Sequence, residues 1–132
     1  MSVTYKIDPA KNLIHTRCIG DVNLEEITDH FRELERDSNR PDRLNVLLDL
    51  REMTYVPEAQ EVRAASYEVE TVLRSVRFQA CAIVVCNDAL FGMMRMFEVF
   101  AREYFSVTQV FRVAAEAEAW LALHEATSKP GK

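Results

Sequence analysis

Hydrophobic and polar residues alternate at the start of the chain and then give way to longer apolar runs. Residues 3–7 alternate apolar with polar, which predicts a half-buried strand. The turn-rich segment 8–12 leads to a second strand at Leu13–Ile19, and so short a connector predicts an antiparallel pair. Leu44–Leu50 and Ala80–Cys86 are almost continuously apolar, as expected for strands that helices cover on both faces.

Helices are predicted between and after these strands. Asn23 and Glu26 have the spacing of a capping box, and they open a helix that stops at the run 37–42. A second helix should begin near Pro57, because proline suits the first helical turn. Its predicted buried stripe is Ala59, Val62, Ala65, Val69, Val72 and Val76. The remaining predicted elements are a third helix from the Asn87-Asp88 cap to about Phe105, a fifth strand at Thr108–Val113 and a helix at Glu116–Glu125.

The resulting order is β-β-α-β-α-β-α-β-α. Alternation of strands and helices with short connections predicts parallel strands joined by right-handed crossovers. The opening hairpin adds one antiparallel strand, so the prediction is an α/β fold with a mixed, mostly parallel five-stranded sheet flanked by helices. We expect a single domain over residues 1–126 and a flexible C-terminal tail at 127–132, where polar residues, Pro and Gly replace the apolar pattern.

Composition narrows the function classes. The 132-residue chain has a net charge of −5, which disfavours nucleic-acid binding because such proteins present a basic surface. No apolar run approaches the roughly 20 residues that a transmembrane segment needs, and the N-terminus lacks the apolar core of a signal peptide. We therefore expect a cytoplasmic protein. The three cysteines lie in apolar stretches and are expected to be buried thiols rather than a disulfide framework.

This order, with certain residues, resembles the STAS-like superfamily, and more closely its SpoIIAA-like branch of small stand-alone bacterial proteins. The residues that carry the resemblance are the DL in Leu44–Leu50, Phe91–Glu98, Val110–Arg112 and Glu118–Leu121. It covers roughly residues 3 to 124. The resemblance implies a non-enzymatic module with a role in regulation or in binding small ligands or lipids.

One departure from the superfamily concerns its phosphorylation switch. Anti-sigma-factor antagonists of the superfamily carry a phosphorylated Ser in a D-S-S-G-like turn after the third strand. Here the corresponding segment, Asp49–Pro57, contains neither Ser nor Gly, and Thr54 is the only nearby hydroxyl of the right kind. Partner switching by phosphorylation of Thr54 is thus an alternative that the sequence supports weakly.

Catalytic and metal-binding motifs are absent from the sequence. Cys86 precedes a helix N-terminus, where a thiolate would be stabilised, but a cysteine phosphatase needs an Arg six residues later, and Gly92 stands there. His15 on a strand, His30 on the polar face of the first helix and His124 on the last helix share no metal-ligand spacing. No cofactor or metal is expected. A small enzyme that uses Cys86 or the acidic strand ends Asp49 and Asp88 is the alternative to a binding module.

A first candidate site follows from the topology. Ligands of open α/β sheets bind outside the carboxyl ends of the parallel strands. The polar and aromatic residues predicted to line such a crevice are Arg51, Thr54, Tyr55, Asn87, Asp88 and Phe91. The simpler interpretation is that Asn87 and Asp88 only cap the third helix.

The third helix supplies a second candidate. Its predicted core stripe is Leu90, Met93, Met94, Phe97, Ala101 and Tyr104, but the apolar surface is wider than this stripe. The residues beyond it that could form an interface are Arg95, Met96, Val99 and Phe100. They form either a wide core face or a contact with a second subunit or apolar ligand. The leading hypothesis is a homodimeric binding or regulatory module that engages a protein partner or a small apolar or amphipathic ligand.

Overall fold

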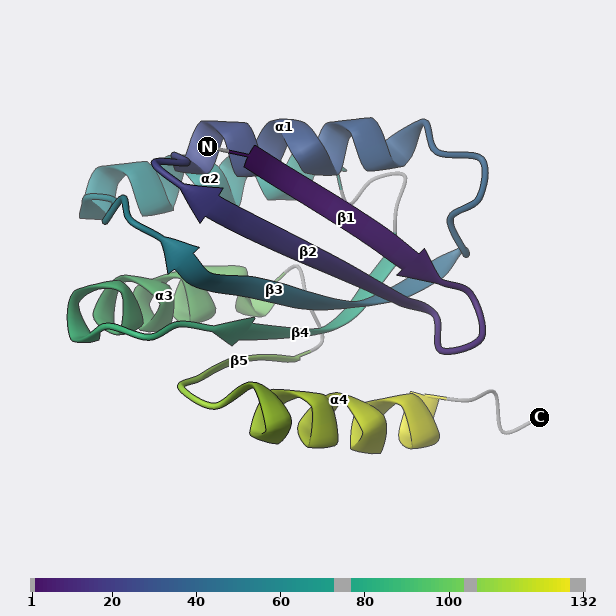
Figure 1. Ribbon diagram of the computed structural model, residues 1–132. Coiled ribbons are helices and arrows are strands. Elements are labelled where there is room, and N and C mark those ends of the chain that lie inside the picture. The colour runs from purple at the N-terminus through teal and green to yellow at the C-terminus, as the bar shows by residue number, and fades with distance from the viewer. Residues whose placement is uncertain (1, 73–76, 104–106, 129–132) are drawn as a thin grey trace.

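The computed structural model describes residues 2–72, 77–103 and 107–128, and it contains one five-stranded sheet with helices on both sides (Figure 1). The elements in chain order are β1 (Ser2–Asp8), β2 (Leu13–Gly20), α1 (Leu24–Glu35), β3 (Arg43–Met53), α2 (Ala59–Val72), β4 (Arg77–Val84), α3 (Asp88–Phe100), a 3₁₀ turn (Ala101–Glu103), β5 (Val107–Phe111) and α4 (Ala114–Ser128). This is the order of strands and helices that the sequence predicts.

The strands lie in the sheet in the order in which they occur in the chain, β1-β2-β3-β4-β5. β1 pairs with β2 in antiparallel fashion, and all other pairs are parallel, so the predicted mixed, mostly parallel sheet is confirmed. The hairpin between β1 and β2 turns at Asn12, whose φ of 50° lies in the left-handed region that Asn tolerates. β2 ends at Gly20, where a φ of 85° favours glycine.

Three helices share one face of the sheet. Adjacent strands added in one direction by right-handed crossovers place their helices on the same side, and α1, α2 and α3 lie together there (Figure 1). Side chains from this face and these helices form the main core, which includes Ile14, Leu34, Leu44, Ile83 and Leu90, all fully buried. β3 is buried on both faces from Leu44 to Leu50, as its continuous apolar run predicts.

Among the described helices, α4 alone lies on the opposite face. Its Ala117 and Leu121 join Leu47, Val84 and Phe111 in a second, smaller core cluster. The helix is therefore held to the sheet by few large side chains.

The main core also contains a buried polar pair. Thr16 Oγ1 of β2 and His30 Nε2 of α1 are hydrogen-bonded at 2.8 Å. Only 5% of His30 is exposed, and its burial lowers the pKa of the imidazole from 6.5 to about 4. The interpretation of His30 as a residue of the polar helix face is wrong, because β1 and its Tyr5 cover that side of α1.

Most predicted helix boundaries hold to within a few residues. The capping box of α1 is present: Asn23 Oδ1 accepts the N–H of Glu26 at 2.9 Å, and the Glu26 carboxylate accepts the N–H of Asn23 at 3.0 Å. α2 begins at Ala59 rather than at Pro57, because Glu58 occupies the cap and its N–H donates to Glu61. Ala59 is accordingly exposed and does not belong to the buried stripe.

The later elements differ more from the prediction. β4 ends at Val84, α3 gives way to the 3₁₀ turn after Phe100, and β5 spans Val107–Phe111. α4 begins earlier than predicted and continues to Ser128, so it includes the first two residues of the expected tail. Tyr104, Phe105 and Val76 lie outside the described residues.

Candidate functional site

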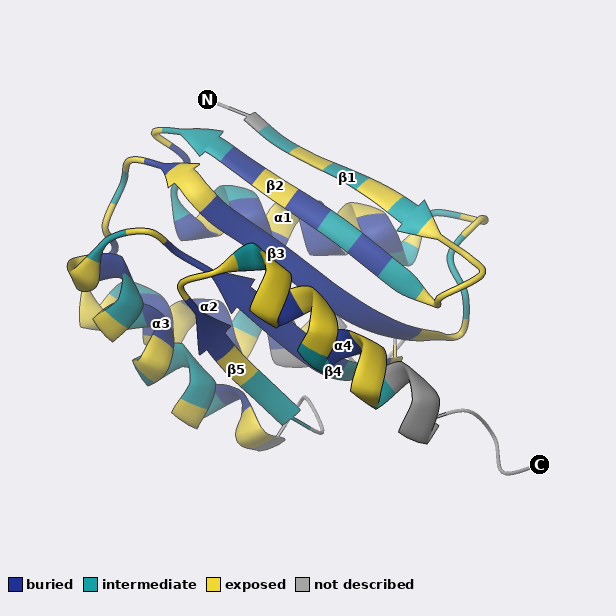
Figure 2. Cartoon of the chain, turned by 60° about the horizontal axis from the view of Figure 1, so that its bottom comes forward, coloured by how far each residue is buried: buried dark blue, intermediate teal, exposed yellow. Residues whose placement is uncertain are grey.

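The α4 side of the sheet is only partly covered. α4 packs over β3, β4 and β5, and β1 and β2 extend past it with none of the described helices above them (Figure 2). The cause is geometric, since five strands about 4.8 Å apart are wider than one helix of about 10 Å. We call this side of β1 and β2 the bare face. Its residues are Thr4, Lys6, Asp8, Leu13, His15, Arg17 and Ile19.

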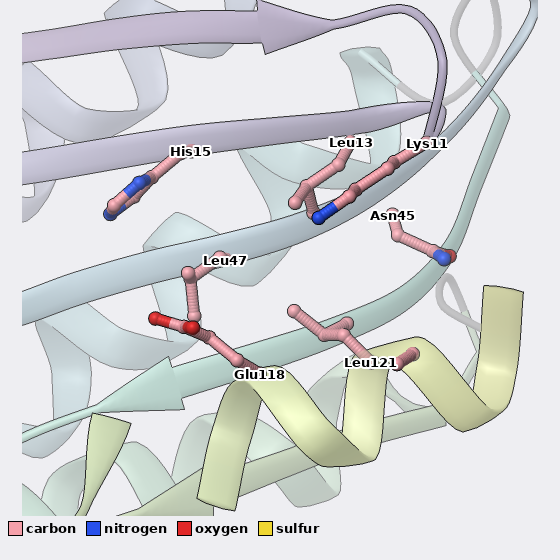
Figure 3. Close-up of a pocket in the computed structure, with 8 residues that line it drawn as sticks. Lys11, Leu13, His15, Asn45, Leu47, Glu118 and Leu121 are labelled. Atoms are coloured by element: carbon pink, nitrogen blue, oxygen red, sulfur yellow. The ribbon is translucent and has the colours of Figure 1, made fainter. Parts of the chain in front are cut away.

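A groove of about 240 Å³ separates the bare face from α4 (Figure 3). Lys11, Leu13 and His15 stand on one side, and Glu118 and Leu121 stand on the other. The remaining residues that line it are Asn45, Leu47 and Ala122. The groove is thus apolar at its centre and carries opposite charges on its two walls.

The way α4 is anchored explains why the groove stays open. On the β5 side of the helix, the Trp120 ring packs against Phe111, with ring centroids 5.4 Å apart, and against His124 at 4.3 Å. On the β2 side the helix presents the small Ala122 and the exposed Glu118. Bulky aromatic groups therefore fill one flank of the helix and leave the other unfilled.

His15 is the least satisfied polar group of the groove. Its Nε2 atom is shielded from solvent and has no hydrogen-bond partner in the described part of the chain. A buried polar atom without a partner costs about 1–3 kcal/mol. A bound group that supplied this hydrogen bond would recover that cost, so His15 favours binding in the groove.

The bare face is basic although the whole chain is acidic. Lys6 and Arg17 are exposed on it, and Lys11 lies at its end in the hairpin. Arg17 pairs with Glu52, whereas the described residues contain no ion pair for Lys6 or Lys11. With a net charge of −5 on the chain, two unneutralised lysines beside an apolar groove form a distinct surface.

Asp49, also on this side of the sheet, is already satisfied within the chain. Arg51 donates to its carboxylate through Nε at 2.9 Å and Nη2 at 2.8 Å, and the Arg51 backbone N–H adds a bond of 3.1 Å. Burial pushes the pKa of Asp49 upward, but these hydrogen bonds and the Arg51 charge outweigh it and hold the pKa below its ordinary value. The carboxylate is therefore ionised and already bound by Arg51, so it does not have the free position that a general base needs.

The six residues of the predicted crevice contact several different partners. Asp88 and Phe91 come together through Arg112, which donates to Asp88 at 2.7 Å and lies 4.1 Å from the centre of the Phe91 ring. Asn87 caps α3 by accepting the N–H of Leu90 at 2.7 Å. This agrees with the simpler interpretation of Asn87 as a helix cap. The crevice as a ligand site remains a prediction.

The other three crevice residues have different partners. The Tyr55 hydroxyl donates to Glu61 at 2.6 Å, near the start of α2. Arg51 is held by Asp49 on the α4 side of the sheet, and the backbone N–H of Thr54 donates to Gly20 at 2.9 Å. Tyr55 is therefore joined to α2, Arg51 to the bare-face side of the sheet and Thr54 to the end of β2. These contacts do not join the three residues to one another.

The predicted interface on α3 is partly exposed. Val99 is 54% exposed, and Arg95 pairs with Glu98 at 3.2 Å. Met96 and Phe100 are half-buried against the main core, and Arg63 lies 5.5 Å from the centre of the Phe100 ring. Two of the four residues therefore contribute to the core, and an interface here remains a prediction.

The cysteines differ from expectation in one respect. Cys18 and Cys81 are buried as predicted, but Cys86 is exposed, because β4 ends two residues before it. Its thiol donates to the carbonyl of Arg51 at 3.1 Å. Burial, with the charges of Asp49 and Glu26, raises the pKa of Cys18 to about 12, and burial also raises that of Cys81.

We therefore expect one of the three thiols of the native protein to react with an aromatic disulfide reagent at pH 8, and that thiol to be Cys86. Titration of native and urea-unfolded protein tests this, with three thiols reacting after unfolding. Cys86→Ser should abolish the native reaction. Reaction of two or three thiols in the folded protein would contradict the burial of Cys18 and Cys81.

Sequence reasoning did not identify Lys11, His15 and Glu118 as site residues. The order of strands and helices did indicate a partly uncovered face of the sheet, because three crossover helices on one side leave a single predicted helix for the other face. The described residues contain no group of three or more His, Cys, Asp or Glu side chains that could hold a metal ion. None of the described helices is both long enough and apolar enough to cross a bilayer.

Comparison with known proteins gives a family and a fold. The SpoIIAA-like family matches residues 13–122. Among solved structures, the chain resembles an uncharacterized protein of the DUF3478 family with a SpoIIAA-like fold from Shewanella loihica PV-4. The TM-score is 0.56 at 14% sequence identity, over 91% of this chain and 92% of the other. No curated protein matches the chain.

Proposed function

Because this chain belongs to the SpoIIAA-like family, which defines its fold and not its role, we propose from its own surface that it is a non-enzymatic binding module. The proposed binding surface is the bare face together with the groove beside α4. The observation that carries the proposal is the half-covered sheet. There an apolar groove meets a shielded His15 Nε2 and two lysines, Lys6 and Lys11, for which the described residues supply no hydrogen-bond partner and no ion pair, respectively.

The size of the groove favours a protein segment over a small molecule. Small-molecule sites usually enclose about 300–1,000 Å³, and this groove offers about 240 Å³ and is open to solvent. The surface also continues past the groove across β1 and β2 (Figure 2). A segment with small apolar side chains and carboxylates fits its shape and its charge, and a small amphipathic ligand is the alternative occupant.

The contacts of the candidate catalytic groups support binding over catalysis. Asp49 is bound by Arg51, Asp88 by Arg112, and the Cys86 thiol by a backbone carbonyl. An enzyme needs such groups directed at a common point where a substrate can react. Asp49 and Cys86 both contact Arg51, and Asp88 contacts Arg112, so each group is already engaged in a structural contact.

A photoreactive amino acid placed at Ala122 in the native host tests the proposal. Ala122 lines the groove and is exposed, and exposed Ala59 on α2 is the matched control position. We expect a discrete cross-linked protein adduct from position 122 and none from position 59. Equal labelling at the two positions, or none at 122, would contradict a protein-binding role.

Native mass spectrometry of protein isolated from the same host separates the two occupants. We expect the measured mass to be that of the chain alone or of the chain in a complex with a protein. A bound small molecule that Leu13→Glu, on the groove wall, displaces would instead support the alternative ligand and contradict the proposed protein partner.

A further inference from the structure

α4 carries apolar side chains on its outer side as well as on the side that packs on the sheet. Ala117 and Leu121 face the sheet. Away from the sheet the exposed residues include Ala115, Ala119, Ala122 and Leu123, the last with 67% of its surface exposed. The apolar stripe of a helix is normally covered. The outer side of α4, which consists of these four residues flanked by Glu116 and Glu118, is therefore a second uncovered surface beside the bare face (Figure 2).

The bare face is about as long as α4. β1 has seven residues and extends about 23 Å, and α4 has fifteen residues and extends about 22 Å. Two helices about 10 Å wide, side by side, have roughly the width of the five-stranded sheet. The bare face thus has room for one more helix of the length of α4.

The two surfaces also match in charge. The outer side of α4 is flanked by Glu116 and Glu118, for which the described residues contain no ion pair, although Glu118 interacts electrostatically with Arg51. The bare face presents Lys6, the carboxylate of Asp8 and, at its end, Lys11. A helix with small side chains and flanking carboxylates would fit this basic, shallow surface. The chain itself contains such a helix, α4.

We propose that the partner is a second copy of this chain, with α4 of each copy packed on the bare face of the other. This inference rests on the proposed function and names the partner of that same surface. A two-fold axis that runs along the helices places the two α4 helices side by side and parallel, between the two sheets. Each bare face is then covered by the partner's helix, and the contact is formed twice, as in a closed dimer.

The area corresponds to a weak contact. The bare face measures about 10 Å by about 23 Å and the outer side of α4 about 10 Å by about 13 Å, so two of each give roughly 700 Å² in flat projection. This value lies in the low range of weak and transient interfaces. Ala115, Ala119 and Ala122 allow the helices to approach closely.

Sedimentation velocity of the purified full chain, over a concentration series that reaches the high micromolar range, tests the dimer. We expect the wild type to be dimeric and Ala119→Arg to be monomeric, because the new side chain would meet the basic bare face. Ala64→Arg makes the same change on exposed α2 and should remain dimeric. Val99→Arg, on the exposed surface of α3, should also remain dimeric. Circular dichroism confirms that each variant is folded.

Chemical cross-linking tests the arrangement of the helices. In a Cys86→Ser background, Ala122→Cys brings two thiols together across the axis and should form a dimer with a short bismaleimide, whereas Ala64→Cys should not. Three results would overturn the proposal: a monomeric wild type, a dimeric Ala119→Arg, or dissociation by Val99→Arg, which would assign the interface to α3. A monomer that still forms a position-122 adduct with another protein would overturn the dimer and leave the proposed function standing. A monomer without an adduct would contradict both.

Discussion

Lowering the pH from 7 to 4 is expected to remove about 3 kcal/mol of folding stability through His30 alone. Burial lowers the pKa of His30 to about 4 in the folded protein, whereas the unfolded chain titrates at 6.5. Below pH 6.5 the unfolded state therefore binds a proton that the folded state does not bind. Stability falls as the pH falls toward about 4, at about 1.4 kcal/mol per pH unit.

Urea unfolding of the wild type and of His30→Gln over this pH range measures the effect. Carboxylates contribute equally to both proteins, so the difference between the two stability curves isolates the imidazole. We expect the advantage of the wild type to shrink by about 3 kcal/mol between pH 7 and pH 4. Parallel curves for His30→Gln, or an NMR titration of His30 near pH 6.5, would contradict its burial beneath β1.

Leu34→Ala is expected to cost about 2–5 kcal/mol of stability. Leu34 is fully buried where α1 packs on the sheet, so truncation leaves a cavity in the main core. Leu123→Ala makes the same chemical change on the outer side of α4, at a side chain that is 67% exposed. It should change the stability of the monomer by less than about 0.5 kcal/mol.

Thermal and urea unfolding of the two variants, at protein concentrations too low for association, give this comparison. The cost at position 34 should exceed that at position 123 several-fold. Similar losses for both variants would mean that Leu123 is covered within a single chain, and that the outer side of α4 is not an uncovered surface.

Much of the fold follows from local pattern. The apolar runs around Leu47 and Ile83 predict strands buried on both faces, and both are buried in this way. The Asn23–Glu26 capping box fixes the start of α1 because it is a contact between residues close in sequence. The start of α2 was harder to predict, since Pro57 suits a first turn but the contact between Glu58 and Glu61 determines the cap.

The candidate site depends on contacts between residues distant in sequence. Nothing local to Lys11 or His15 indicates that α4 lies across from them. The groove exists because Trp120 anchors α4 toward Phe111, on the side away from β2. His30 illustrates the same limit, because its position on the helix predicts a polar face, and only the packing of β1 shows that it is buried.

In the assembled protein, the bare face and the outer side of α4 should both be covered. Methyl NMR of alanine-labelled protein with a soluble paramagnetic agent, at concentrations in the high micromolar range, measures this coverage. We expect the methyl groups of Ala115, Ala119 and Ala122 to be protected, and those of Ala64 and Ala89, which are exposed on α2 and α3, not to be protected. Equal broadening of all five methyl signals would contradict it.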